Sequence, residues 1–137
     1  ESKFIVDHVK FSSMEQFMMY QKAITFQDQT IAKEILQTKD SAKIKQLGRQ
    51  VRNYNDHIWN GVRQIVVYEG LVAKFSQNEE LKKQLKETKT AILAECAVKD
   101  RIWGIGLSMK DLKRFDITQW RGQNLLGYAL IEVRKRL

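Results

Sequence analysis

Residues 100–106 read Asp-Arg-Ile-Trp-Gly-Ile-Gly, and these residue types could form a binding loop for a flat ligand. The indole of Trp103 offers a planar surface on which a ring could stack. Gly104 and Gly106 carry no side chain and would let the backbone approach a ligand closely. Asp100, three residues before the tryptophan, could reach whatever stacks there. The other interpretation is a turn anchored by a buried tryptophan and braced by Asp100, and the spacing alone favours neither.

A second set of candidate residues lies in the first half of the chain. Glu15 follows Ser12 by three residues, the spacing of a helix capping box, so a purely structural role is its first interpretation. Lys22 lies seven residues further on, which places it on the same helix face as Glu15, although a solvated lysine is the common case. Arg49 follows Gly48 in a helical stretch, where glycine costs about 1 kcal/mol relative to alanine. That cost indicates close packing, a nearby ligand or a helix boundary.

The elements that must position these residues are predicted to be helices almost throughout. Helices are expected from about residue 12 to 24, after Asp28, from Asp40 to about 51, from 55 or 56 to 75, after Asn78, and from about 124 to 137. The helix ending at residue 75 is apolar on most of its surface and contains Trp59, so we expect it to be the buried central helix. Trp59 is then a core side chain by default, and Asn124 is expected to cap the last helix.

The remaining segments are short or irregular. Residues 4–6 predict a strand, and the apolar run 91–97 is equally compatible with helix or strand. Residues 98–123 hold three of the seven glycines and two of the three tryptophans, and we expect an extended functional loop in which Trp120 is structural. No proline, repeat or low-complexity linker divides the chain. We therefore predict a mainly α class: one compact domain over residues 1–137 with a short strand or two and a Gly/Trp-rich loop.

Composition narrows the function classes. The net charge of +8 favours anionic partners such as phosphates, nucleotides or nucleic acid, but the charge is spread along the chain and no helix carries a dense basic face. One cysteine and two histidines argue against a thiolate- or imidazole-rich metal site, and no cofactor is expected. Cys96 reads as a small buried apolar side chain, and a single cysteine fits a reducing, cytoplasmic setting. No apolar run approaches the roughly 20 residues of a membrane span, and residues 1–11 could be a trimmed segment.

The order and spacing of several motifs resemble the NADAR (YbiA-like) family over residues 12–137. The motifs are Met14-Glu15-Gln16-Phe17, Gln21-Lys22-Ala23, Leu47-Gly48-Arg49, Trp59, Lys74-Phe75-Ser76-Gln77-Asn78, the string at 100–106, Trp120-Arg121-Gly122-Gln123-Asn124-Leu125-Leu126-Gly127 and Val133-Arg134. The resemblance implies a metal-free N-glycosidase that cleaves the bond between a ribose C1′ and a heterocycle nitrogen. Some members act on phosphoribosylated pyrimidine intermediates of riboflavin synthesis, and others remove ADP-ribose from guanine as antitoxins.

The same resemblance implies which residues serve the site. Glu15, Trp59 and Trp103 correspond to pocket residues, with Lys22, Arg49 and Asn124 as supports. This chain departs from the family twice. Ile105 stands between the two glycines where the riboflavin-type members have an acid, and the Ser-Asn-Phe segment common near the family's N-terminus is missing or degenerate. The first departure favours the guanine-linked substrate, and the second leaves one wall of the pocket undefined.

The residue types suffice for this chemistry without the family. A fixed carboxylate, Glu15 or Asp100, would stabilise the oxocarbenium-like transition state at C1′ and activate water. An indole would hold the heterocycle, and Lys22 or Arg49 would hold phosphates. Three functions follow: a hydrolase of ADP-ribosylated guanine, free or within DNA or RNA; a hydrolase of phosphoribosylated riboflavin precursors; and a non-catalytic ADP-ribose or nucleotide-binding module.

Overall fold

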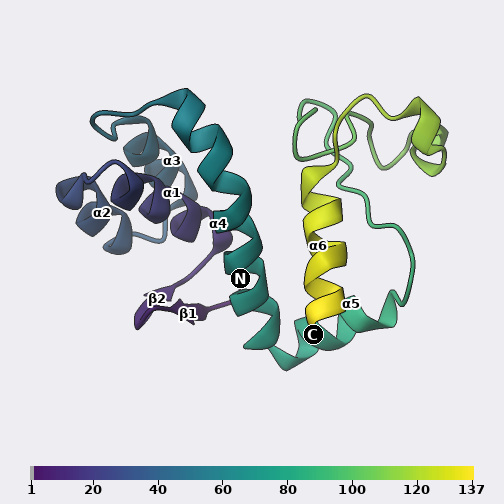
Figure 1. The fold of residues 1–137 in the computed structure, drawn as a ribbon, viewed down its shortest axis with the longest axis horizontal. Helices are drawn as coiled ribbons and strands as arrows, with labels where there is room; N and C mark the ends of the chain where they lie inside the picture. Colours follow the sequence, from purple (N-terminus) through teal and green to yellow (C-terminus); the bar gives the residue numbers. More distant parts are fainter. Residues whose placement is uncertain (1) are drawn as a thin grey trace. The chain divides into compact units, whose positions relative to one another are not determined.

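The computed structural model describes residues 2–137 and divides the chain into two compact units, residues 2–83 and 84–137. Each unit is described by itself. The first contains, in chain order, β1 (Phe4–Val6), β2 (Val9–Phe11), α1 (Met14–Thr25), α2 (Gln29–Leu36), α3 (Ser41–Arg49) and α4 (Asp56–Ser76). Helix α5 (Glu79–Glu87) carries the chain from the first unit into the second. The mainly α class is confirmed (Figure 1). No helix within residues 2–137 has the length and apolar character needed to cross a membrane.

The strand expected at residues 4–6 belongs to a small antiparallel hairpin whose second strand the sequence reading missed. Phe4 pairs with Phe11, and a two-residue turn at Asp7 and His8 joins the strands with φ of 49° and 69°. Positive φ at both turn positions gives the twist that a tight hairpin requires. The amide of Gln77, just after α4, accepts from the Ile5 N–H at 2.7 Å and donates to the Ile5 carbonyl at 2.8 Å. The Gln77 side chain thus pairs with both backbone polar groups of Ile5 at the edge of the strand.

The core of the first unit is built on aromatic rings from the hairpin and α1. Phe4, Phe11 and Phe17 are each at most 2% exposed, and their ring centroids lie 5.1–5.8 Å apart. The Phe11–Phe17 contact is edge-to-face, a geometry that favours aromatic pairs beyond simple burial. Around these rings pack Ile35 of α2, Ile44 of α3 and Trp59 of α4. This packing fixes α1 against its neighbours and therefore fixes the residues α1 carries.

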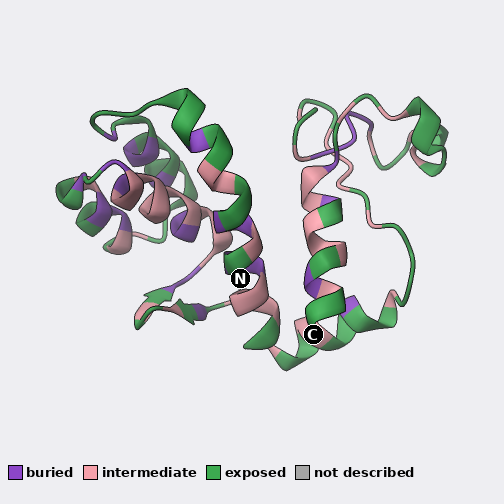
Figure 2. Cartoon of the chain, viewed as in Figure 1, coloured by how far each residue is buried: buried purple, intermediate pink, exposed green. Residues whose placement is uncertain are grey.

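Helix α4 is buried along one side only, so the expectation of a fully buried central helix is wrong. Trp59, Val66 and Leu71 are buried, whereas Ile58 is 50% exposed and Ile65 is 63% exposed. Figure 2 shows buried and exposed residues alternating along this helix. The apolar character of α4 extends beyond the face that packs against α1, which is why periodicity overestimated its burial.

Two glycines of α4 predict opposite effects of the same substitution. A Cβ at Gly61 would meet no atom within 4 Å, whereas one at Gly70 would lie 2.7 Å from two ring carbons of the buried Phe17. We expect Gly61→Ala to raise the free energy of unfolding by about 1 kcal/mol, the helix-propensity gain. Gly70→Ala should lower it by about 1–2 kcal/mol, because overpacking outweighs that gain. Urea unfolding of both variants checks this, and an equal shift in the two would contradict it.

Asp28 joins α2 to the segment after α3. Its side chain is 1% exposed and accepts from the Ile31 N–H at 3.2 Å as the cap of α2, and from the Arg52 N–H at 2.9 Å. The Arg52 guanidinium lies 3.5 Å away. The Arg52 N–H, followed by the Ile31 N–H and the guanidinium, lowers the pKa of Asp28 against the opposing effect of burial.

Acid should therefore weaken the fold through Asp28. A carboxyl whose pKa is lower in the folded state stabilises the fold at neutral pH, and this contribution is lost as pH falls through the lowered folded pKa. We expect Asp28→Asn to reduce stability at pH 7 and to flatten the decline between about pH 4 and the lower folded pKa. Unfolding midpoints measured across pH 2–7 test this. An unchanged slope in the variant would remove Asp28 as the cause.

The second unit has little regular structure besides α6 (Leu125–Arg136). Two short 3-10 turns, Leu112–Phe115 and Ile117–Gln119, interrupt the long loop expected at 98–123. The run 91–97 forms neither helix nor strand, so both alternatives for it are wrong. Its place in the fold comes from hydrogen bonds to later residues, described below. Cys96 is partly rather than fully buried, because it lines an open pocket with Trp120 and Phe115.

Candidate active site

Glu15 is not part of the helix cap, so the capping-box interpretation is wrong. Ser13, rather than Ser12, caps α1 by accepting from the Gln16 N–H at 3.1 Å. The reciprocal bond is made by Gln16, whose carbonyl oxygen accepts from the Ser12 N–H at 2.7 Å. The cap begins one residue later than the spacing suggested, and this leaves the Glu15 carboxylate available for another role. The Glu15 side chain is 31% exposed.

The Glu15 carboxylate lies 3.9 Å from the ammonium of Lys45 on α3. Lys45 and Arg49 are one turn apart on α3, just as Glu15 and Lys22 share a face of α1. Where α1 and α3 meet, Gly48 of α3 packs against the Met19 side chain of α1 so tightly that a Cβ would collide with the Met19 sulfur. Close packing therefore explains the helical glycine, and so does the predicted helix boundary, because α3 ends at Arg49. The packing brings α1 and α3 together with one carboxylate and three cations.

Lys22 is held near the other end of this α1–α3 face. Its ammonium lies 4.3 Å from the centroid of the Tyr54 ring, so it is not simply a solvated lysine. Burial lowers the pKa of Lys22, the nearby Asp56 carboxylate opposes that change, and Arg49 adds to it. The influence of Arg49 places both predicted phosphate-binding residues within electrostatic reach of each other.

Tyr54 and Asp56, which the sequence reading missed, fix this cation. The Tyr54 hydroxyl donates to Asp56 Oδ1 at 2.7 Å, and the Phe26 ring packs edge-on against Tyr54 at 5.3 Å. Burial, and then the hydrogen bond and charge of Asp56, raise the pKa of Tyr54. Tyr54 and Asp56 flank Asn55, the cap of α4.

Lys45 was not named from the sequence either. Lys45 lies one turn before Arg49 on α3, and this i,i+4 spacing could have placed it on the same face as Arg49.

Trp59 is 5% exposed and belongs to the core of the first unit. Its burial matches the default expectation for an indole in an apolar helix. A role for Trp59 in a pocket stays a prediction that comes from the family resemblance.

In the second unit, Asp100 braces the loop that it begins. Asp100 Oδ1 accepts from the backbone N–H groups of Ile102 at 3.0 Å and Trp103 at 2.8 Å. The indole of Trp103 is half-buried. Because one carboxylate oxygen makes both bonds, the bracing role uses only part of the side chain. Asp100 therefore orients the segment that presents Trp103.

The glycines of this loop allow two stretches of backbone to pack together. A Cβ at Gly104 would lie 2.9 Å from the carbonyl oxygens of Asp100 and Glu95, and Gly106 has a φ of +73° that disfavours other residues. Backbone bonds join the loop to residues 121–124: Arg121 N–H to Ile105 O at 2.8 Å and Asn124 N–H to Gly104 O at 3.0 Å. Packing thus gives both glycines a structural reason, and contact with a ligand stays a prediction. Ile105 is completely buried.

Asn124 occupies the N-cap position of α6 but does not cap it with its side chain, contrary to expectation. The residue is fully buried with φ of 54°, and its amide instead binds the 91–97 segment. Its Oδ1 accepts from the Glu95 N–H at 2.9 Å, and its Nδ2 donates to the Leu93 carbonyl at 2.8 Å. Asn124 therefore holds an irregular segment in place. Trp120 is structural in the same sense, donating to the Arg114 carbonyl at 2.9 Å.

Taken by unit, the predicted site residues fall into two groups. The first unit brings Glu15, Lys22 and Arg49 to one face and adds Lys45, and the second unit holds Asp100, Trp103, Gly104, Gly106 and Asn124 in or beside one loop. No three His, Cys, Asp or Glu side chains within residues 2–137 gather as metal ligands. The first group places a carboxylate among cations, an arrangement suited to a phosphorylated substrate.

The chain is similar to known proteins over nearly its whole length. The NADAR domain model matches residues 1–137. N-glycosidase R617 of Acanthamoeba polyphaga mimivirus is 40% identical over 129 residues, covering 94% of this chain and 76% of the viral protein. N-glycosidase YbiA of Escherichia coli is 30% identical over 132 residues, covering 96% of this chain and 74% of YbiA. A riboflavin biosynthesis protein of Vibrio vulnificus is 30% identical over 118 residues, 86% of this chain but 29% of that protein.

The fold gives the same result. The solution NMR structure of E. coli YbiA superposes with a TM-score of 0.77 at 28% identity, covering 98% of this chain and 71% of the YbiA chain. The full-length family match, the relatives of 30–40% identity and the shared fold are mutually consistent. The chain belongs to the NADAR family, among whose members are N-glycosidases.

Proposed function

We propose that this protein hydrolyses the bond between ribose C1′ and the base nitrogen of ADP-ribosylated guanine, as an antitoxin-like enzyme that reverses the modification. Water adds its oxygen to C1′, the C1′–N bond breaks, and the departing nitrogen receives the proton. Membership of the family supports a hydrolase of N-glycosyl bonds. The observation that carries the proposal is the Glu15 carboxylate, outside the helix cap and 3.9 Å from Lys45.

Each charged residue of the α1–α3 face has a role in this proposal. Glu15 stabilises the positive charge that develops at C1′ and takes a proton from the attacking water. Lys45 orients that carboxylate through the ion pair. Lys22 and Arg49 bind the diphosphate of ADP-ribose, which carries charges opposite to theirs. The lysine held on the Tyr54 ring is pre-positioned, so less side-chain entropy is lost when a phosphate binds.

The residues of the second unit serve the base in the same proposal. Trp103 stacks on the guanine, and Gly104, Gly106 and Asn124 shape the loop that presents it. Trp59 stays assigned to substrate binding, as the resemblance implies. Ile105 supports guanine-linked ADP-ribose over the riboflavin intermediate, because its buried apolar side chain offers no acid at that position. The single cysteine supports a cytoplasmic setting, and the net charge of +8 supports DNA or RNA as the carrier of the modified base.

Asp100 is proposed as the second carboxylate of the reaction, and two variants separate its charge from its bracing bonds. Asp100→Asn retains an oxygen that can accept from the Ile102 and Trp103 N–H groups but removes the charge. We expect it to lower kcat by about 100-fold with an unchanged unfolding midpoint. Asp100→Ala should also lose about 1–2 kcal/mol of stability. Wild-type turnover by Asp100→Asn would restrict this residue to bracing.

The function itself is tested by chromatographic analysis of product release. The purified protein is incubated with an oligonucleotide that carries one ADP-ribosylated guanine, and in parallel with the phosphoribosylated pyrimidine intermediate. Release of free ADP-ribose with restored guanine is the expected result. Cleavage of the pyrimidine intermediate alone would favour the second candidate, which the Vibrio relative's name supports. Saturable ADP-ribose binding without turnover would reduce the protein to a binding module.

A further inference from the structure

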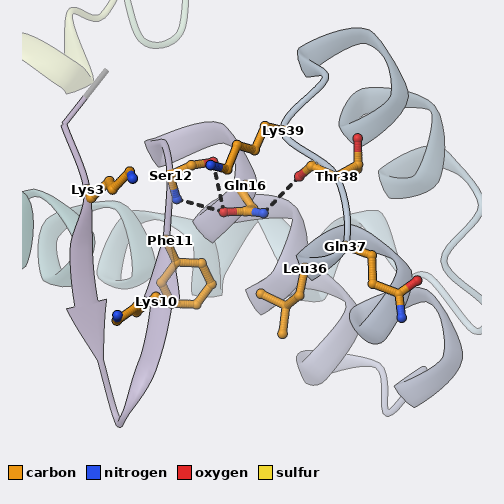
Figure 3. Close-up of a pocket in the computed structure, with 9 residues that line it drawn as sticks. All are labelled: Lys3, Lys10, Phe11, Ser12, Gln16, Leu36, Gln37, Thr38 and Lys39. Atoms are coloured by element: carbon orange, nitrogen blue, oxygen red, sulfur yellow. Dashed lines mark hydrogen bonds between the residues drawn. The ribbon is translucent and has the colours of Figure 1, made fainter.

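A second charged feature of the first unit is an open pocket of about 270 Å³ beside the buried side chain of Gln16. It is bordered by the hairpin, the start of α1 and the connection between α2 and α3 (Figure 3). Neither Glu15, Lys22, Lys45 nor Arg49 lines it. The pocket is therefore a separate feature of the unit.

The lining of this pocket is strongly basic. Lys3 precedes β1, Lys10 lies in β2, and Lys39 precedes α3, while no acidic residue lines the pocket. None of the three forms an ion pair with another residue of the described part of the chain. In Figure 3 the Lys39 side chain extends across the pocket mouth toward Ser12, on the side where Lys3 lies. The nearest acid in sequence, Asp40, accepts from the Ala42 N–H as the cap of α3.

The wall behind these lysines is rigid. The Gln16 side chain is buried, and its Nε2 donates to the carbonyls of Ile35 at 3.1 Å and Thr38 at 3.0 Å. Its Oε1 accepts from both the N–H and the hydroxyl of Ser12. One amide therefore ties the end of β2 to the end of α2 and to the segment that carries Lys39. These bonds fix the segment after Lys10 and the segment before Lys39 relative to each other.

We propose that this pocket binds the phosphate group of a phosphorylated small molecule, at a site separate from the hydrolytic one. Ammonium groups are point-charge donors suited to phosphate, and the three lysines that line this pocket raise its positive potential. The pocket contains no guanidinium that would favour a planar carboxylate through paired hydrogen bonds. Its volume, at the small end of ligand sites, accommodates a phosphate with part of the group that carries it. The inference does not depend on the proposed hydrolysis.

Pyrophosphate is the probe for this site, titrated into the wild-type chain and followed by NMR at constant ionic strength. We expect saturable shifts of the Ser12 and Thr38 backbone amides and of the Gln16 side-chain amide. The variant K3Q/K10Q/K39Q should weaken the affinity at least tenfold. The variant K33Q/K43Q/K86Q removes the same charge from exposed helix positions that do not line the pocket, and should bind as the wild type does.

Two further measurements complete the test. The three mutated lysines are exposed, so their loss should leave the hydrogen bonds of Gln16 in place. Preserved Gln16 side-chain resonances in K3Q/K10Q/K39Q would show that the pocket wall is intact. AMP should bind through this pocket and adenosine should not. Equal weakening by both triple variants would mean non-specific attraction to net charge and would overturn the proposal. Binding of single-stranded oligonucleotide without binding of pyrophosphate or AMP would also overturn it, since the ligand would then be a nucleic-acid backbone.

Discussion

Replacing Glu15 with glutamine should abolish turnover while leaving the fold intact. The amide keeps the size of the side chain but cannot accept the proton of the attacking water or balance the charge at C1′. Loss of a residue of this type lowers rates by about 10²–10⁴-fold, so kcat should fall by at least 100-fold. Substrate affinity should change far less, because Lys22 and Arg49 remain. Product release and substrate binding are measured on the same preparations.

The structure also predicts that this variant is stable. Because Ser13 and Gln16 form the cap of α1, Glu15→Gln removes no capping bond. The ion-pair partner of Glu15, Lys45, is 59% exposed, and ion pairs at such positions contribute about 0–1 kcal/mol. The unfolding midpoint should therefore stay close to the wild-type value. A large drop in stability accompanying the loss of activity would return Glu15 to a structural role.

Two companion variants make the result specific. Glu34→Gln on α2 makes the same chemical change at an exposed helical position and should leave both rate and stability unchanged. Lys45→Met removes the cation that orients the carboxylate and should lower kcat by a smaller factor than Glu15→Gln, about tenfold. Wild-type turnover by Glu15→Gln would contradict the catalytic assignment regardless of the other two.

How far the sequence could anticipate this molecule differs between its parts. Helix positions in the first unit were predictable because caps are local: Asp28, Asp40 and Asn55 each accept from a backbone N–H two or three residues later. The predicted capping box of α1 was wrong by one residue. Ser12 and Ser13 are both good caps, and Gln16 competes with Glu15 for the reciprocal hydrogen bond. Only the packing of Gln16 into the α2 end decides between them.

Long-range contacts account for what the sequence could not give. The Glu15–Lys45 pair joins residues 30 positions apart on different helices, and the Lys22–Tyr54 contact depends on where the segment after α3 turns back. The run 91–97 has no periodicity that specifies its shape, since its backbone is held by a side chain about 30 residues away. The order of motifs did identify the family, because a shared fold preserves these contacts as spacings.

The second large effect should come from Asn124, through stability. Asn124→Ala removes both bonds to the 91–97 segment and leaves the Glu95 N–H and the Leu93 carbonyl, which are partly buried, without the partner that Asn124 provides. A buried group left unpaired costs about 1–3 kcal/mol, and partial burial places these two groups toward the lower end, so the unfolding free energy should fall by about 2–3 kcal/mol. Gly127 packs so closely on the Leu93 carbonyl and the Asn124 amide that the segment has little room to shift and find other partners.

Asn124→Gly and Asn124→Asp separate the reasons for this loss. Glycine removes the same bonds but accepts the φ of 54° without strain, so it should be about 1 kcal/mol less destabilising than alanine. Aspartate keeps the bond from the Glu95 N–H but sets a negative oxygen against the Leu93 carbonyl. It should destabilise the protein at pH 7 and recover as acid protonates it, because a neutral carboxyl can donate to Leu93. Urea unfolding at pH 7 and at an acidic pH that protonates the aspartate measures these differences. Hydrogen exchange of the Glu95 amide should also be faster in the alanine and glycine variants. If that exchange stayed at the wild-type rate in Asn124→Ala, the side chain would not be what holds the 91–97 segment.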